Sequence, residues 1–360
     1  MSRAACAVIH SKALQHNLQC VRNASPDSRI LAIIKANGYG HGMVRVAQAL
    51  HQADGFGVAS LHEAVVLRQA GIDNTIVLLE GFADLEELRL ASQHRLDVVV
   101  HQQQQVDLII NHSFPAAVTI WLKLDTGMHR LGLSSDSFRA AAQQLQACDW
   151  INTDIRLMTH FACADDRDND MTNVQLHRFE TSAAGLAGEH SLANSAAILG
   201  WPATHGQWLR PGIMLYGVSP FTEGQGAAEG LQPAMTLKSR LIAVNHYRRG
   251  ETVGYGASWS CPEDMPIGVV AIGYGDGYPR HAPSGTPLLV NGRRVPMVGR
   301  VSMDMITVDL RTQPDANIGD EVILWGDGLA VEEIARLAST IAYELLCHVS
   351  QRVHMIDDGE

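Results

Sequence analysis

A lysine followed by a glycine-rich loop is the first feature of the chain that could do chemistry. Lys35 comes directly after five apolar residues, and Gly38, Gly40 and Gly42 follow it. A lysine at the end of a strand can simply extend its ammonium group into water. A partly desolvated lysine instead loses its proton readily and attacks aldehydes. Because the glycines also let a ligand approach the backbone closely, the segment favours a lysine that forms a Schiff base.

The order and spacing of these residues exclude the common nucleotide-binding motifs. A P-loop has its lysine after the glycines, and dinucleotide folds use GxGxxG, whereas this segment reads GxGxG. The chain has 27 Lys and Arg against 38 Asp and Glu, a net charge of −11, which opposes binding of nucleic acid. An anionic ligand would therefore need local donors such as backbone amides or single arginines.

Tyrosines flanked by glycine form a second chemical pattern. Three of the seven tyrosines, Tyr39, Tyr255 and Tyr274, have glycine on both sides. A phenol, with a pKa of about 10, acts as a base at neutral pH only where cations stabilise the phenolate. The pattern is unusual for core tyrosines and indicates functional roles, although Tyr39 could also pack over its loop.

The elements that must position these residues alternate between strands and helices as far as about residue 215. Eight strands are predicted: 30–35, 55–60, 75–80, 97–101, 118–125, 155–162, 190–195 and 207–212. Eight such units predict a (β/α)8 barrel, although a doubly wound sheet has the same local pattern and the last two strands are weak. In such barrels the C-terminal strand ends carry the active site, so Lys35 is expected at the mouth.

The pattern changes after Tyr216. A small, glycine-rich segment at 221–233 reads as a linker, and mostly strands follow, with Asn291-Gly292 as a type I′ hairpin turn and one helix near 331–340. We therefore predict an α/β fold: a TIM-type barrel over 11–220, then a smaller mostly-β domain over 233–360. About the first ten residues could also pair with this second domain.

Other features restrict the class of protein. No apolar run reaches the ~20 residues of a membrane span, and the N-terminus has no signal-peptide pattern, so a cytoplasmic protein is expected. The six cysteines are widely spaced without a CxxC pair, which predicts free thiols. No metal site is predicted, because HExxH is absent and Cys163, Asp165 and Asp166 read as a polar loop.

Several segments, in order and over nearly the whole chain, resemble motifs of alanine racemases, which use pyridoxal 5′-phosphate (PLP). They are AIIKANGYGHG (32–42), WLKLDTGMHRLG (121–132), MTHFACAD (158–165), LANSAAIL (192–199), WLRPGIMLYGVSP (208–220), VGYGASW (253–259), IGYGDGYPR (272–280) and GRVSMDMITVD (299–309). The resemblance implies interconversion of L- and D-alanine by a homodimer with shared active sites.

The resemblance also implies the catalytic pair. Lys35 would hold PLP as a Schiff base and serve as one base, and Tyr255 from the partner's β domain would serve as the other. Racemisation needs one base on each face of a planar carbanion. Arg210 would hydrogen-bond the pyridine nitrogen of PLP without protonating it, which disfavours decarboxylation and transamination.

The remaining family roles fall on residues of both predicted domains. The resemblance assigns cofactor contacts to Tyr39, Arg130, His160, Asn194, Ser195, Gly212 and Ile213, and substrate contacts to Arg130, Tyr274 and Met303. Lys123 matches a lysine that family members carbamylate, and an unmodified lysine is an equal alternative. Some members place a phosphate-binding tyrosine before an Arg-Val pair; here Gln351 precedes Arg352-Val353, which puts that contact in doubt.

Three alternatives stay open at this point. A PLP racemase of broader specificity would share all these motifs. A barrel-fold PLP decarboxylase should have an acidic residue where Arg210 stands. A non-catalytic PLP-binding protein would consist essentially of the barrel alone. The sequence also leaves open whether the enzyme makes D-alanine for the cell wall or degrades L-alanine.

Overall fold

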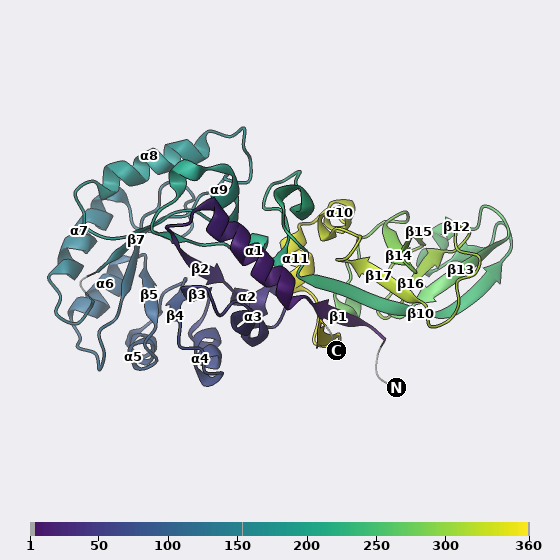
Figure 1. Ribbon diagram of the computed structural model, residues 1–360, viewed down its shortest axis with the longest axis horizontal. Coiled ribbons are helices and arrows are strands. Elements are labelled where there is room, and N and C mark those ends of the chain that lie inside the picture. The colour runs from purple at the N-terminus through teal and green to yellow at the C-terminus, as the bar shows by residue number, and fades with distance from the viewer. Residues whose placement is uncertain (1–3, 153, 359–360) are drawn as a thin grey trace.

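The computed structural model describes residues 4–152 and 154–358 of the chain. It has two parts, a barrel ringed by helices and an elongated β domain beside it (Figure 1). The polypeptide passes from the first part to the second at the long strand β10 (Met235–Tyr247). The predicted fold class is confirmed.

The barrel contains a sheet of eight parallel strands in the described part of the chain. Their order is β8-β7-β6-β5-β4-β3-β2-β9. The strands are β2 (Arg29–Ile33), β3 (Gly55–Val58), β4 (Thr75–Leu78), β5 (Asp97–Val100), β6 (Ile120–Lys123), β7 (Arg156–Met158), β8 (His190–Ser191) and β9 (Trp208–Leu209). Their apolar residues are buried on both faces, because helices cover the outside and side chains fill the inside.

The ring closes between the two shortest strands. An isolated parallel bridge joins Asn194 to Arg210, and the Arg210 amide donates to the Ala193 carbonyl over 2.9 Å. These residues lie just past the ends of β8 and β9. The closure that the weak strand patterns only suggested is therefore present, and it is made by residues predicted to belong to the site.

Helices surround the barrel on its outer side (Figure 1). They are α1 (Ser11–Ala24), α3 (Met43–Ala49), α4 (Leu61–Gln69), α5 (Leu85–Gln93), α6 (Gln103–Ile110), α7 (Ser135–Gln146), α8 (Met171–Ala183) and α9 (Ser195–Gly200). The short element α2 (Lys35–Tyr39) lies at the barrel mouth and has non-helical backbone angles at Ala36, Asn37 and Gly38. Several begin at the caps that their sequences predict. Ser60 and Glu63 form a capping box at the start of α4, and Gly71, with φ of +79°, follows its end.

The β domain is built on a second sheet, with strand order β13-β16-β15-β14-β17-β10-β1-β18. Besides β10 its strands are β1 (Cys6–Ile9), β13 (Met265–Val270), β14 (Pro287–Val290), β15 (Arg293–Val298), β16 (Ile306–Asp309), β17 (Glu321–Trp325) and β18 (His354–Asp357), with a small ribbon of β11 (Thr252–Val253) and β12 (Trp259–Ser260). The N-terminal β1 pairs antiparallel with β10 and parallel with β18. Asn291 and Gly292 turn between β14 and β15 with φ of 49° and 75°, as a type I′ turn requires.

Two helices of the second half lie toward the barrel (Figure 1). The predicted helix is α10 (Val331–Leu337), and a second helix that the sequence did not suggest, α11 (Ala342–Cys347), follows it. A Cβ at Gly40 would lie 2.0 Å from the Leu346 carbonyl oxygen, so α11 packs directly against the glycine loop after Lys35. Short 3-10 turns complete the fold: η1 (Pro202–Thr204), η2 (Ile213–Tyr216), η3 (Gly226–Glu229), η4 (Tyr255–Ala257) and η5 (Tyr274–Asp276).

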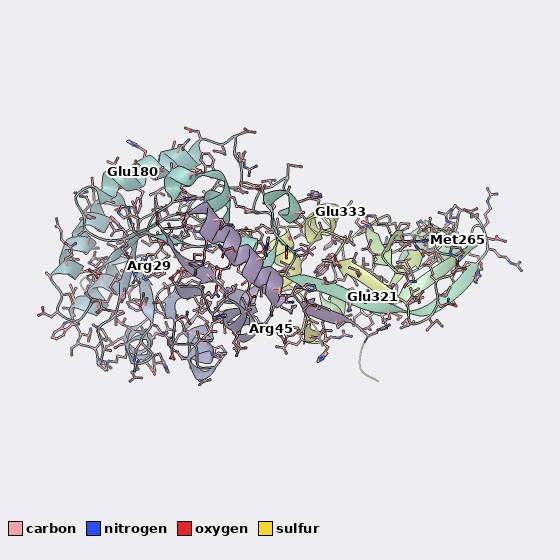
Figure 2. The ribbon with its side chains drawn as sticks, viewed as in Figure 1. Arg29, Arg45, Glu180, Met265, Glu321 and Glu333 are labelled. Carbon is pink, nitrogen blue, oxygen red and sulfur yellow. The ribbon has the colours of Figure 1, made fainter. Side chains whose placement is uncertain are left out.

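A salt bridge also spans the junction of the two domains. Arg45 of α3, labelled in Figure 2 on the side of the barrel next to the β domain, forms a salt bridge with Asp357 of β18 over 2.6 Å. All six cysteines are free thiols, as predicted. Within residues 4–152 and 154–358, the helices are too short or too polar to span a membrane.

Candidate active site

A cavity of about 970 Å³ opens where the barrel strands end and α10 and α11 approach them. This size is ample for a small-molecule ligand. Ten residues predicted from the sequence line it: Lys35, Tyr39, Lys123, Arg130, His160, Asn194, Ser195, Arg210, Gly212 and Ile213. The fold thus brings together residues that are up to 178 positions apart, from Lys35 to Ile213.

Lys35 lies at the start of a left-handed turn (residues 36–40), not at the end of the strand itself. β2 ends at Ile33, and residues 36 to 40 then have φ values of 53°, 54°, 63°, 50° and 80°. A residue with a Cβ loses roughly 1–2 kcal/mol in this conformation, and Ala36, Asn37 and Tyr39 all adopt it. Backbone strain of this kind persists only where surrounding contacts enforce it, and it concentrates at functional sites.

Tyrosine rings form one wall of the cavity. The Tyr39 ring stacks on Tyr216 with a centroid distance of 4.7 Å, and the Tyr216 hydroxyl donates to the Ile33 carbonyl over 3.0 Å. On its other side Tyr39 lies 6.1 Å from the ring of Tyr343, which belongs to α11. Burial raises the pKa of the Tyr39 phenol, so it is neutral and can donate a hydrogen bond.

Tyr343 is the lining residue that sequence reasoning missed. Before Arg352-Val353, where some family members have a tyrosine, this chain has Gln351, which is exposed and does not line the cavity. The available signal was the tyrosine in the short apolar stretch Ala342–Cys347, which is too brief to show a helical period. The β domain of the same chain thus supplies an aromatic wall to the barrel cavity.

Backbone donors converge at one end of the cavity. The Ser195 hydroxyl oxygen accepts from the Gly212 amide over 2.8 Å and from the Met214 amide over 3.4 Å. A Cβ at Gly212 would lie 2.7 Å from the Tyr39 hydroxyl, so a side chain would block this corner. Asn194 accepts from the Ala197 amide and caps α9 as expected. The corner can offer several N–H and O–H donors to one anionic group.

Arg210 is buried and held by neighbouring carbonyl groups. Its terminal nitrogens donate to the carbonyls of Ser191 (2.5 Å), Thr159 (2.6 Å) and Leu192 (3.0 Å) and to the Ser191 hydroxyl (2.8 Å), and one lies 3.2 Å from His160 Nδ1. Burial lowers its pKa, yet a guanidinium stays protonated at neutral pH. Among the described residues these bonds leave the Nε–H as the donor available to a ligand.

Several positive charges surround this part of the cavity. Lys123 is only 8% exposed, and burial together with Arg210, Arg130 and Lys35 lowers the pKa of its amine to about 8. Arg130 is exposed and lines the rim. Burial and the same cations lower the pKa of His160 well below its usual range, so its imidazole is neutral. The inner cavity therefore attracts anions.

Three predicted residues do not reach this cavity. Tyr255, Tyr274 and Met303 lie on the β domain and are 69%, 41% and 52% exposed. Their loops adjoin one another: the Tyr274 amide donates to the Ser302 carbonyl over 3.0 Å, and a Cβ at Gly299 would lie 3.0 Å from the Val253 carbonyl oxygen. Within one chain, the residues predicted as a site form a buried group and an exposed group.

Comparisons with known proteins were made over the whole chain. The family model described as alanine racemase, N-terminal domain, matches residues 9–220, and the model described as alanine racemase, C-terminal domain, matches residues 234–357. The alanine racemase of Nitrosococcus oceani is 55% identical over 96% of this chain and 97% of its own length. The alanine racemase of Shewanella denitrificans is 53% identical over the same shares of the two chains.

Solved structures agree with these sequence matches. The biosynthetic alanine racemase of Pseudomonas aeruginosa superposes with a TM-score of 0.95 at 44% identity, covering 99% of this chain and 100% of that one. The alanine racemase of Acinetobacter baumannii superposes with a TM-score of 0.92 at 36% identity, again over 99% and 100% of the two chains. The likeness therefore includes both domains and their relative placement.

Proposed function

Because this chain belongs to the alanine racemase family, we propose that it interconverts L-alanine and D-alanine with PLP as its cofactor. The observation that carries the proposal is the cavity that joins Lys35, Arg210 and the hydroxyls of Ser195 and Tyr39 beside Gly212. Each of these groups matches a different part of PLP, as the next paragraphs argue.

The residues present fit PLP at three points. The Lys35 amine can bond its aldehyde carbon, and the Arg210 Nε–H can donate to its pyridine nitrogen. The Ser195 hydroxyl accepts from the Gly212 and Met214 amides and so keeps its own hydrogen to donate; together with the Tyr39 hydroxyl beside Gly212 it suits the phosphate. Tyr343, whose ring lies next to that of Tyr39, adds a hydroxyl on the side of α11. PLP, when bound, supplies an electron sink for the charge left on the substrate Cα when its proton departs.

Racemisation requires a proton carrier on each face of the substrate. We assign one face to the Lys35 amine and the other to the Tyr255 hydroxyl. In the direction from L- to D-alanine, Tyr255 as the phenolate takes the Cα proton, and Lys35 as the ammonium returns a proton to the opposite face. In the reverse direction the two residues exchange these tasks.

Two arginines orient the reactants. Arg210 remains a cation that donates to, but does not protonate, the pyridine nitrogen, so proton return to Cα is favoured over routes that need a stronger electron sink. Hydrogen bonds to three carbonyls hold the Arg210 guanidinium in place and so fix the direction of its Nε–H. Arg130 at the rim can bind the substrate carboxylate with two parallel hydrogen bonds.

Lys123 is proposed to carry a carbamate. Burial, together with three nearby cations, lowers the pKa of its amine to about 8, so an appreciable fraction is neutral and nucleophilic near that pH. A neutral amine adds to CO2 and releases one proton, which leaves an anion at a position that carries a cation when the lysine is protonated. The product would attract Arg130 and hold its guanidinium toward the substrate.

The two groups of site residues are proposed to meet in a homodimer. Tyr255, Tyr274 and Met303 are exposed on adjoining loops of the β domain, outside the cavity of their own chain. A two-fold arrangement would let each chain deliver these residues to the barrel of the other. Tyr274 and the Met303 backbone amide would then face the substrate entrance.

The proposal is tested by incubating the purified PLP-loaded protein with L-alanine in D2O. Deuterium should appear at Cα while optical rotation is lost, because the proton returned to Cα comes from a residue in exchange with solvent. Release of CO2 would instead indicate a decarboxylase, and absence of exchange would indicate a non-catalytic PLP-binding protein. Comparable exchange with larger amino acids would indicate a racemase of broader specificity.

A further inference from the structure

A buried histidine stands immediately after the left-handed turn and takes no part in the proton transfers above. His41 is fully buried and lies two residues beyond Tyr39. It does not line the cavity. Its contacts nevertheless link the backbone of the turn to the aromatic wall.

The His41 ring bonds two carbonyl groups of the turn. Its Nδ1 atom lies 2.8 Å from the Tyr39 oxygen and 3.1 Å from the Gly38 oxygen. Carbonyl oxygens can only accept, so Nδ1 carries the hydrogen. Its Nε2 atom is buried and has no hydrogen-bond partner among the described residues, so a second N–H there would be unsatisfied. The ring is therefore neutral, with its proton on Nδ1.

Other contacts show why these two bonds matter. Two other side-chain bonds involve this segment, and neither reaches its carbonyls: Glu63 accepts from the Ala36 amide over 2.8 Å, and the Asn37 side chain accepts from the Met43 amide over 3.0 Å. His41 alone among the described side chains bonds the carbonyls in the middle of the turn. Its ring also lies 4.7 Å from that of Tyr216, on which Tyr39 stacks.

We propose that His41 is a positioning residue, whose Nδ1–H holds the left-handed turn so that the Lys35 amine and the Tyr39 hydroxyl face the cavity. It touches neither reactant and acts through these two residues. The inference rests on the proposed function, because the direction of Lys35 matters only if that residue carries PLP.

The test compares three substitutions at this position. In His41→Asn the amide nitrogen occupies the place of Nδ1 and keeps the donor. In His41→Gln the amide nitrogen occupies the place of Nε2, and in His41→Leu a side chain of similar bulk offers no donor. A matched control is His112→Leu, which removes a histidine just past the outer helix α6 whose Nδ1 bonds the Leu108 carbonyl of that helix over 3.0 Å.

Two measurements are made on the apoprotein variants: PLP affinity by absorbance titration, and amide hydrogen exchange of residues 36–42. We expect the leucine and glutamine variants to bind PLP about tenfold more weakly and to exchange faster, as loss of a buried hydrogen bond requires. The asparagine variant and the His112→Leu control should stay close to the unmodified protein. The proposal would be overturned if the leucine variant kept the PLP affinity and exchange rates of the unmodified protein. It would also be overturned if the asparagine variant lost as much PLP affinity and exchange protection as the leucine variant.

Nitrogen-15 NMR of the unmodified apoprotein gives a check that needs no variant. His41 should appear as a neutral imidazole protonated on Nδ1 at neutral pH, and a charged ring or an Nε2–H tautomer would refute the assignment. Both this spectrum and the exchange rates are independent of catalysis. If Lys35 proved not to bind PLP, the proposed function would fail while these two measurements still reported on the turn.

Discussion

The barrel mouth and the exposed loops of the β domain each hold part of one proposed active site, but they differ in how firmly the chain's own fold holds the reactive groups. At the mouth, Lys123 is 8% exposed, and Arg210 is fixed by hydrogen bonds to three carbonyls. On the β domain, Tyr255 is 69% exposed. The first region is preorganised by the chain's own fold, whereas the second has its reactive group in solvent.

This difference shows which part of the proposed site is held rigid by the fold of a single chain. The mouth tolerates left-handed backbone at Ala36, Asn37 and Tyr39 because buried contacts hold them. The loop around Tyr255 is also left-handed, at Gly254 (φ of 77°), Gly256 (73°) and Ala257 (47°), but it leaves the tyrosine uncovered. Cofactor binding should therefore depend on a single chain, and racemisation on two.

The largest expected effect comes from the mouth. Lys35→Ala should lose the visible absorbance of lysine-bound PLP and reduce racemisation by at least about a thousandfold, because it removes both the covalent attachment and one base. Absorbance spectra and a coupled assay for D-alanine measure the two losses. A variant that kept the visible band would show that another residue carries the cofactor.

A change on the β domain should separate the two regions most clearly. Tyr255→Phe should retain the cofactor spectrum and lose about 10²- to 10⁴-fold in racemisation of L-alanine, because only the base on one face is removed. Exchange of the Cα proton of D-alanine, taken by Lys35, should be less affected. Full activity in the phenylalanine variant would contradict the two-base assignment.

A smaller effect is expected at Lys123. With the dissolved CO2 concentration held constant, carbamate formation should increase as the pH rises through about 8, because only the neutral amine reacts. Carbon-13 NMR with labelled bicarbonate measures the adduct, and Lys123→Arg, which keeps the charge but cannot form it, is the control. A signal that persists in the arginine variant would place the carbamate elsewhere.

Much of the fold could be predicted because the barrel strands are continuous apolar runs, buried on both faces. All eight predicted strands are present, but most were predicted too long: 118–125 was expected and Ile120–Lys123 is observed. Apolar residues continue past the ends of these strands into the loops and the cavity wall. Hydrophobicity alone therefore does not mark the residue at which a strand ends. The last two strands were weak because each has only two residues.

The parts of the site that escaped prediction depend on tertiary contacts. The glycines after Lys35 indicated an unusual backbone, but left-handed conformations at Ala36 and Tyr39 have no sequence signature. Tyr343 lies on a six-residue helix, too short for a periodic pattern, and reaches the cavity only because the two domains pack together. Motif resemblance, in contrast, identified the ten lining residues because each lies in a distinctive segment.

Mixing the two defective variants tests the central claim most directly. Lys35→Ala and Tyr255→Phe chains are dissociated, combined in equal amounts and reassembled. If each site takes its lysine from one chain and its tyrosine from the other, every mixed dimer contains one intact site, and activity should return to roughly a quarter of the wild-type value with random pairing. A mixture no more active than its components would contradict a site shared between two chains.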